Sequence, residues 1–306
     1  ATAAEAHLDA VDATRDEVHD AGDGVGAVRR GRTARQHFDA LDERSRNLVD
    51  VRRDRIDAAG LHAATIEQHQ RAGGAKAAQG TIRMLALDVT DDASVAAAVS
   101  ELIRLEGRID LLVNNAGIGI APAGAEESSI EQAQALFDTN FFGLVRMTRA
   151  VLPHMRRQGS GRIINIGSIL GVVPMPYIAL YAASKHAVEG YSEALDHELR
   201  TRGIRVAVIE PAFTKTAFEA NTIEPDATLD EYRSVRASIT QVFSQSMASA
   251  DDPDVVAKVV LKAASAARPK LRYTAGVAAG RLSLLRAFAP AGILDAGIRK
   301  NLQLND

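Results

Sequence analysis

Three consecutive stretches of the sequence decide the fold: GRIINIGS at 161–168, YAASKHAVEGYSEALDHELRTRG at 181–203 and IRVAVIEP at 204–211. The first and third hold near-continuous apolar runs, which are typical of strands buried on both faces of a parallel sheet. The middle stretch has apolar residues at three- and four-residue spacing, as on one side of an amphipathic helix: Ala187, Val188, Tyr191, Ala194, Leu195 and Leu199. Together they predict one strand–helix–strand unit.

The same alternation continues on both sides of this unit. The further elements that we expect are strands at 82–89 and 109–117, helices at 92–107 and within 129–158, a last strand at 272–276 and an apolar helical segment at 277–304. Repeated units of this kind indicate an α/β protein with a Rossmann-like, doubly wound parallel sheet.

The first 80 residues do not follow this pattern. Only 13 of them are Val, Ile, Leu, Phe, Met or Tyr, against 74 of the following 226. A low apolar fraction is typical of disorder or of marginal helices. We therefore divide the chain into an atypical segment of low hydrophobicity at 1–80 and an α/β domain with an apolar C-terminal extension at 81–306.

Composition excludes several classes of function. The chain of 306 residues has no Cys, so a disulfide scaffold, a thiolate metal site and a Cys nucleophile are excluded, and we expect no metal. The lack of Cys suits a reducing cytosol, and we expect a cytoplasmic protein. A net charge of −3 gives no basic surface that would indicate binding to nucleic acid.

The first residues do not have the pattern of a secretory signal. The uncharged stretch 163–184 contains Pro and Asn, which favours a buried strand and loop, and we expect no membrane partner.

Tyr181 and Lys185 form a Y-x-x-x-K pattern at the start of the predicted helix. Their spacing places both on one side of the helix, where a cation favours phenolate and lowers the pKa of the phenol. Tyr181 is then a candidate general acid/base, although an exposed helix pair would give the same pattern. Ser168 ends a predicted strand, where its hydroxyl could donate to a substrate carbonyl or cap a helix.

These residues belong to a longer ordered set. LDVT at 87–90, NNAG at 114–117, Asn140, Ser168, the Tyr181–Lys185 pair and PAFTKT at 211–216 occur in one order and spacing. The chain resembles the short-chain dehydrogenase/reductase family in this set, over about 81–275. The resemblance implies an oxidoreductase that transfers a hydride between a nicotinamide cofactor and an alcohol or ketone. The cofactor would be NADP or NAD, with NADP slightly favoured.

The resemblance also implies a role for each matching residue. Tyr181 would be the catalytic acid/base, Lys185 would lower its pKa, Ser168 would orient the substrate and Asn140 would hold a water. The implied cofactor-binding residues are Asp88 and Val89 at the adenine, Asn115, Ala116 and Gly117 at the ribose and pyrophosphate, Tyr181 and Lys185 at the nicotinamide ribose, and Pro211, Thr214 and Thr216 at the carboxamide. Ala212 stands where the family usually has Gly.

One signature of the family, T-G-x-x-x-G-x-G, is not found. GDGVGA at 22–27 matches G-x-G-x-x-A, but no strand precedes it, and we interpret it as a chance match. Residues 1–80 could be an out-of-frame translation, a degenerate half of the fold, or an unusual nucleotide site. We expect a chain without the signature to bind little or no nicotinamide cofactor, and micromolar affinity would contradict this.

Substrate and partners follow from weaker signals. Apolar residues within 213–250, where the family has a substrate lid, suggest a hydrophobic alcohol or ketone, unless they only pack on the sheet. The resemblance implies a homodimer or homotetramer formed through the helices around 134–158 and 180–202. The alternative function is a non-catalytic binding or scaffold protein on a degenerate form of this fold.

Overall fold

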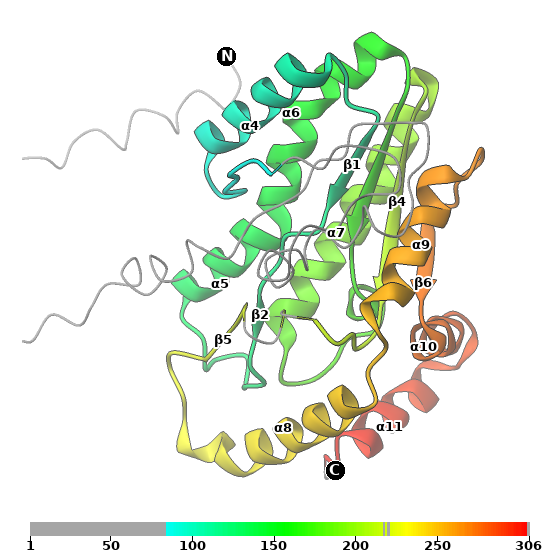
Figure 1. Ribbon diagram of the computed structural model, residues 1–306. Helices are drawn as coiled ribbons and strands as arrows, with labels where there is room; N and C mark the ends of the chain where they lie inside the picture. The colour runs from blue at the N-terminus through cyan, green and yellow to red at the C-terminus, as the bar shows by residue number, and fades with distance from the viewer. Residues whose placement is uncertain (1–83, 217, 219–220, 305–306) are drawn as a thin grey trace, which may run out of the picture.

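A four-stranded parallel sheet forms the centre of the computed structural model, which describes residues 84–216, 218 and 221–304 (Figure 1). The strand order is β1-β3-β4-β6, with β1 at Leu111–Asn114, β3 at Gly161–Ile166, β4 at Ile204–Pro211 and β6 at Arg272–Ala275. Leu111 pairs with Arg162, Gly161 with Ile204, and Val208 with Arg272. Each strand therefore pairs with one from a distant part of the chain.

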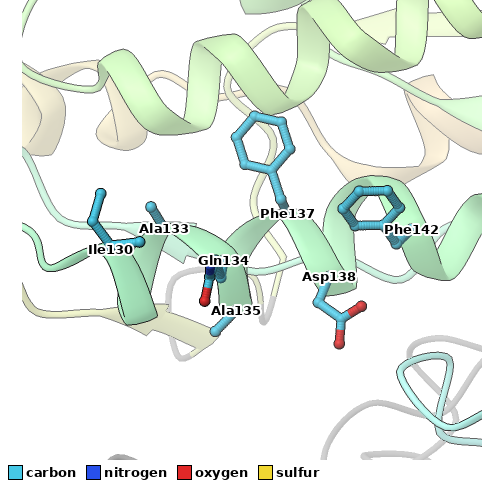
Figure 2. A pocket seen from close by; sticks show the side chains of 7 residues that line it. All are labelled: Ile130, Ala133, Gln134, Ala135, Phe137, Asp138 and Phe142. Carbon is cyan, nitrogen blue, oxygen red and sulfur yellow. The ribbon is translucent and has the colours of Figure 1, made fainter. Parts of the chain in front are cut away.

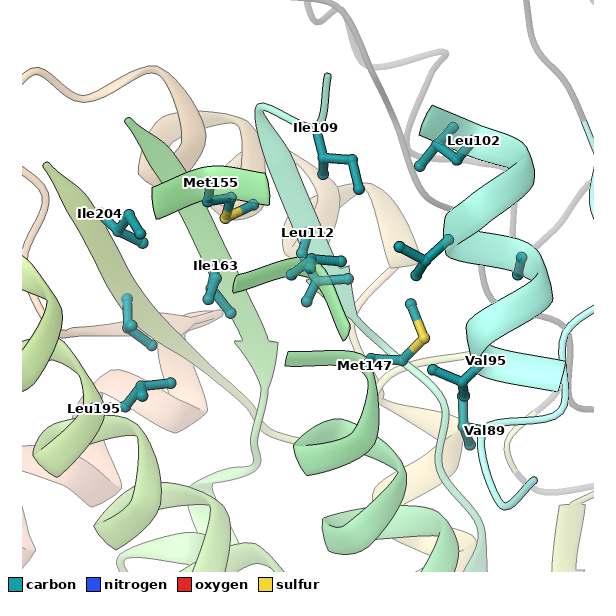
Figure 3. Close-up of a cluster of buried hydrophobic side chains, with 14 of the residues drawn as sticks. Val89, Val95, Leu102, Ile109, Leu112, Met147, Met155, Ile163, Leu195 and Ile204 are labelled. Carbon is teal, nitrogen blue, oxygen red and sulfur yellow. The ribbon is translucent and has the colours of Figure 1, made fainter. Parts of the chain in front are cut away.

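Helices cover both faces of the sheet. On one face lie α4 (Asp92–Glu106), α6 (Gly143–Gln158) and α7 (Ala179–Leu199), over a core that contains Leu112, Met147, Ile163, Leu195 and Ile204 (Figure 3). On the other face α9 (Pro253–Ser265) packs Val260 and Ala263 against Ile164 and Ile209. This arrangement confirms the doubly wound α/β fold that the apolar runs predicted.

The other elements surround the carboxyl ends of the strands. Two short strands, β2 (Gly119–Ile120) and β5 (Thr222–Ile223), pair with each other. The remaining helices are α5 (Ile130–Phe137), the π-helical turn η3 (Asp138–Phe142), the 3₁₀ turns η4 (Ile169–Gly171), η5 (Arg200–Arg202) and η7 (Asp230–Tyr232), α8 (Arg233–Ala248), α10 (Val277–Phe288) and α11 (Ala291–Asn301). The last strand and the helical segment after it are confirmed.

Two predicted elements differ in the structure. Met84–Asp88, within the expected strand 82–89, forms no strand, although Leu87 and Val89 are buried against α4 and α6. A strand needs a neighbour for its ladder, and the described residues place none beside this segment. The helical stretch 129–158 is divided by η3. What was predicted for residues 1–80, including the match at 22–27, lies outside the described residues.

Candidate active site

Tyr181 and Lys185 lie one helical turn apart near the start of α7, as their spacing predicted. The Ser168 side chain lies beside the Tyr181 hydroxyl and lowers the pKa of the phenol. Lys185 is buried, and its Nζ lies 5.7 Å from the centroid of the Tyr181 ring. The same Nζ donates to the Ile166 carbonyl oxygen at 3.1 Å. A phenol, an ammonium and a hydroxyl therefore meet at the carboxyl end of β3.

Ser168 has one of the two roles that its position suggested, since it caps a turn. Its donation to a substrate carbonyl stays a prediction. Ser168 follows the last residue of β3 by two positions and is buried. Its Oγ accepts a hydrogen bond from the Leu170 backbone N–H at 3.1 Å and so caps the 3₁₀ turn η4. The cap fixes the hydroxyl beside Tyr181, because a side chain that accepts from its own turn has little freedom to rotate.

Burial sets the proton affinities of this pair. It raises the pKa of Tyr181 to about 12, against an opposing effect of the Ser168 side chain. It lowers the pKa of Lys185 to about 8, against an opposing effect of the Glu189 carboxylate. The net pKa of Tyr181 is therefore raised rather than lowered, because loss of hydration is the larger effect. That Lys185 favours the phenolate stays a prediction.

Asn140 lies in the π-helical turn η3 and connects two parts of the site. Its Oδ1 accepts from the Ile118 backbone N–H at 2.8 Å, and its Nδ2 donates to the Ile118 carbonyl at 3.0 Å and to Ser184 Oγ at 3.2 Å. A π-helical turn inserts one extra residue, and such turns are frequent at functional sites. The buried amide therefore joins the segment after β1 to α7, one residue before Lys185.

The NNAG turn leads directly from β1 into this region. A Cβ on Gly117 would lie 3.3 Å from Asn140 Oδ1 and 3.8 Å from Lys185 Nζ, so a glycine leaves space there. Asn115 is exposed and Ala116 half-buried. A small cavity beside the turn is lined by Val89, Asn114, Ala116, Asn140, Leu144 and Ile166. The cavity has a volume of about 10 Å³, which is room for about one water molecule.

The other predicted cofactor-binding residues lie at the ends of their elements. Asp88 Oδ1 accepts from the Thr90 backbone N–H at 2.8 Å and from Thr90 Oγ1 at 2.7 Å, while Val89 packs against Gly143 of α6. Pro211 ends β4. Thr214 Oγ1 donates to the Ala212 carbonyl, and Thr216 Oγ1 accepts from the Phe218 N–H. The two threonines thus start the lid segment rather than contact Tyr181.

Described residues of the candidate lid segment, 213–250, lie beside Tyr181. The Phe218 ring lies edge-on to Tyr181 with 5.8 Å between the ring centroids. Strand β5 pairs with β2, which places Ile223 in an apolar cluster with Ile118, Ile120 and Leu136. Tyr181 therefore faces an apolar cover formed by a part of the chain that follows β4.

Sequence reasoning missed the polar contacts that hold the lid. Glu127 is fully buried and forms an ion pair with Arg236 of α8. Its carboxylate also accepts from the Leu229 N–H at 2.8 Å and the Gly124 N–H at 2.6 Å. Nearby, the Ser129 N–H donates to Asp226 Oδ1 at 2.7 Å. Partners about a hundred residues apart leave no signal in a single sequence.

A buried charged cluster beneath the site was also missed. Arg272 of β6 donates to Glu189 Oε2 and Glu193 Oε2, each at 2.9 Å, and its Nε lies 3.6 Å from Glu210 Oε1. Burial and the Glu189 carboxylate raise the pKa of Glu210 to about 7, against the opposing effect of Arg272. The sequence did contain a pattern that indicates this cluster: Lys185, Glu189 and Glu193 are spaced four residues apart, which places three charged side chains on one side of α7.

Comparison with known proteins identifies the family. The model of the short chain dehydrogenase family matches residues 54–227. The chain belongs to this family. The match begins upstream of the division that we placed near residue 80, and that division stays a prediction. The family consists of NAD(P)-dependent oxidoreductases.

Two curated relatives are enzymes. The chain is 49% identical to a 3-ketodihydrosphingosine reductase of Bacteroides thetaiotaomicron over 46% of its own length and 52% of the relative. It is 35% identical to retinol dehydrogenase 8 of Bos taurus over 70% of each protein. The match thus spans about half of the first relative and over two thirds of the second.

Solved structures share the fold. A short-chain dehydrogenase of Streptomyces avermitilis superposes with a TM-score of 0.60 at 30% identity, over 72% of this chain and 76% of that one. Family members from Burkholderia cenocepacia, in complex with NADP, and Burkholderia phymatum, in complex with NAD, give TM-scores of 0.55 and 0.57 at 26% and 25% identity. They cover 70% of this chain each, and 77% and 76% of their own lengths.

Proposed function

We propose that this chain reduces a ketone or oxidises an alcohol on a hydrophobic substrate, with Tyr181 as the acid/base. One observation carries the proposal: Tyr181 lies beside the Ser168 side chain and the buried ammonium of Lys185. A proton donor, a carbonyl-orienting hydroxyl and a cation are the groups that a carbonyl reduction requires from the protein.

In the reducing direction, each side chain has a separate task. The Ser168 hydroxyl orients the substrate carbonyl, and the Tyr181 hydroxyl gives its proton to the carbonyl oxygen. The Lys185 ammonium stabilises the resulting phenolate, whose formation the high pKa of Tyr181 otherwise opposes. Asn140, fixed by Ile118 and Ser184, keeps the two halves of the site in register. NADPH or NADH, when bound, supplies the hydride.

The residues around the NNAG turn fit a nucleotide cofactor. Gly117 leaves open space between Asn140 and Lys185, which a larger side chain would reduce. We propose that Lys185 holds the nicotinamide ribose, that Asn115–Gly117 lie under the adenosine ribose, and that Asp88 and Val89 contact the adenine. Pro211, Thr214 and Thr216 are proposed to hold the carboxamide.

A hydrophobic substrate is supported by the lid. Phe218 and Ile223 place apolar side chains beside Tyr181, where a charged substrate would lose its hydration without a partner. The two relatives named above are a reductase of a long-chain ketone and a dehydrogenase of retinol by name. We therefore propose a long-chain or polycyclic ketone or alcohol as the substrate class.

A homo-oligomer is supported by an apolar hollow on the outer side of α5 and η3. The hollow, of about 460 Å³, is lined by Ile130, Ala133, Gln134, Ala135, Phe137, Asp138 and Phe142 (Figure 2). Ile130 is 70% and Phe142 48% exposed. We propose that this face joins two copies of the chain in a cytoplasmic homodimer or homotetramer. Sedimentation equilibrium of the wild type and of Phe142→Ser tests it, with dissociation as the expected result.

Cofactor titration tests the enzyme function against the scaffold alternative, which the missing glycine signature favours. For the enzyme, NADPH or NADH fluorescence should saturate at micromolar cofactor, and a long-chain ketone should be reduced by the wild type and not by Tyr181→Phe. For the scaffold, neither cofactor binds and neither variant turns over. Turnover by Tyr181→Phe equal to the wild type would contradict the proposed role of Tyr181.

A further inference from the structure

The last two helices present an unusual amount of apolar surface to solvent. Five of the ten exposed large apolar side chains of the described residues lie on α10 and α11. They are Val277, Leu284, Leu285 and Phe288 on α10 and Ile293 on α11, between 50% and 81% exposed. We name them the C-terminal apolar surface. In Figure 1 these helices lie beyond β6, far from α4.

The exposed residues of α10 share one side of the helix. Positions 277, 281, 284, 285 and 288 follow the helical repeat, so Arg281 lies among four apolar residues. The opposite side of α10 is packed: Ala279 is fully buried, and Leu282 contacts the cluster of Ile169 and Val173. A surface helix ordinarily turns its apolar side inward, whereas α10 carries apolar residues on both sides.

The charge of this region limits what can cover it. Residues 277–304 contain Arg281, Arg286, Arg299 and Lys300 against Asp295 alone, a net charge of +3 in a chain of net charge −3. Two such surfaces brought together in a dimer would place like charges against each other. Anionic lipid headgroups complement the charge, and acyl chains accept the apolar side chains.

We propose that α10 and α11 dock the protein on the surface of an anionic lipid bilayer. The helices would lie in the plane of the interface, with the C-terminal apolar surface below the headgroups and the basic side chains among them. Among the described residues, no helix is long and apolar enough to cross a bilayer. The proposal replaces the sequence-based expectation of no membrane partner, which considered only spanning.

The docking helices also contact the candidate active site. Leu282 of α10 and Ile298 of α11 pack in the same cluster as Ile169 and Ala212, next to Ser168 and Pro211. Membrane binding would therefore place the site one helix away from the lipid. This consequence, which rests on the proposed function, gives a hydrophobic substrate a short path from bilayer to Tyr181.

Vesicle co-sedimentation of the full chain tests the docking without any measure of turnover. Vesicles of phosphatidylcholine with about one third phosphatidylserine should carry the protein down, and vesicles of phosphatidylcholine alone should carry much less. Raising the salt from about 0.05 M to about 0.5 M should weaken the binding, because the charges are exposed. Leu284→Ser with Phe288→Ser should weaken it about tenfold or more.

Matched variants distinguish binding through this surface from non-specific hydrophobic binding to vesicles. Met84→Ser removes an exposed apolar residue before α4, outside the proposed subunit interface, and should leave vesicle binding unchanged. Arg281→Gln with Arg286→Gln should remove most of the preference for phosphatidylserine. Failure of the wild type to bind these vesicles overturns the proposal, as does binding that Leu284→Ser/Phe288→Ser leaves intact. Dissociation of an oligomer by that double variant would assign the surface to a second copy and also overturn it.

Discussion

The two sides of the candidate active site are held together by different kinds of contact. On the Tyr181 side, Lys185 belongs to α7 and Ser168 follows β3 by two residues, and both elements are packed into the core of the sheet. On the lid side, Glu127–Arg236 and Ser129–Asp226 join residues 127–129 to the lid segment through polar contacts, next to an apolar cluster that is smaller than the core of the sheet. Segments with few buried apolar contacts open at lower free energy than core elements. We therefore expect α7 and β3, which position Tyr181, to stay closed while the lid segment opens more easily. We call these the rigid side and the releasable side of the site.

The largest effect should come from the rigid side. Tyr181→Phe removes the proton donor, and we expect kcat to fall about 10²- to 10⁴-fold with an unchanged free energy of unfolding. Turnover and denaturant unfolding measure the two quantities. Tyr191→Phe, on the same helix, is the control and should keep its kcat. A parallel loss of stability in Tyr181→Phe would mean that the phenol is structural.

The next largest effect should come from the buried ion pair of the lid. Glu127→Ala leaves Arg236 with a charge that has lost its main partner, and we expect a loss of about 3 kcal/mol. Hydrogen exchange should show the loss in 224–236 and not in α7. The double variant Glu127→Ala/Arg236→Met should recover much of it. Glu126→Ala, an exposed neighbour, should change little. Equal exchange in α7 would show that the two sides open together.

The third largest effect should be a pH dependence of the unfolding free energy that comes from Glu210, on the rigid side of the site. Because burial raises the pKa of Glu210 to about 7, the folded protein holds a proton there that the unfolded chain releases at lower pH. The stabilisation is complete in acid and is lost as the pH rises through about 7. We expect the unfolding free energy to fall by about 1–3 kcal/mol from about pH 5 to about pH 8 from this group.

Glu210→Gln should flatten that dependence. Glu193→Gln is the matched control, because Glu193 pairs with the same Arg272 but is half exposed, and Arg272 lowers its pKa. Denaturant unfolding at several pH values measures both variants. A Glu210→Gln variant with the slope of the wild type would mean that Glu210 is ionised throughout this range.

The smallest effect should come from Ser129 on the lid side. Its Oγ accepts from the Gln132 N–H at 3.1 Å, capping α5, and donates to Asp226 Oδ2 at 2.5 Å. Ser129→Ala should lower the unfolding free energy by about 1 kcal/mol, typical of a lost cap. Ser128→Ala is the control. A loss several times larger would mean that the Asp226 contact, rather than the cap, holds the lid.

Local sequence patterns predicted the positions of Tyr181, Lys185 and Ser168, but they could not predict the contacts that hold the lid segment. The spacing of Tyr181 and Lys185 fixes a shared helix face, and the apolar run before Ser168 fixes a strand end, so both positions followed from neighbours in sequence. Met84–Asp88 was predicted as a strand because its composition is right, but a ladder depends on a partner elsewhere in the chain.

Burial and long-range pairing explain the other differences. The proton affinity of Tyr181 depends on the surrounding packing, which the Y-x-x-x-K pattern does not contain. The Glu127–Arg236 pair joins residues whose order in the chain gives no period. The outward side of α10 was seen in the sequence only as an apolar segment, since periodicity alone does not tell which side of a helix meets the core.

The strand order has a consequence for how the chain folds. Leu111 meets Arg162, Gly161 meets Ile204, and Val208 meets Arg272, so every ladder in the described sheet closes a long loop. Chains dominated by such non-local pairings have a high contact order and fold slowly, since the loop entropy is lost before the contacts form. Ser168, Tyr181 and Pro211 come together only when β3 and β4 have paired. During synthesis, the candidate active site would therefore assemble late, after residue 211 has left the ribosome.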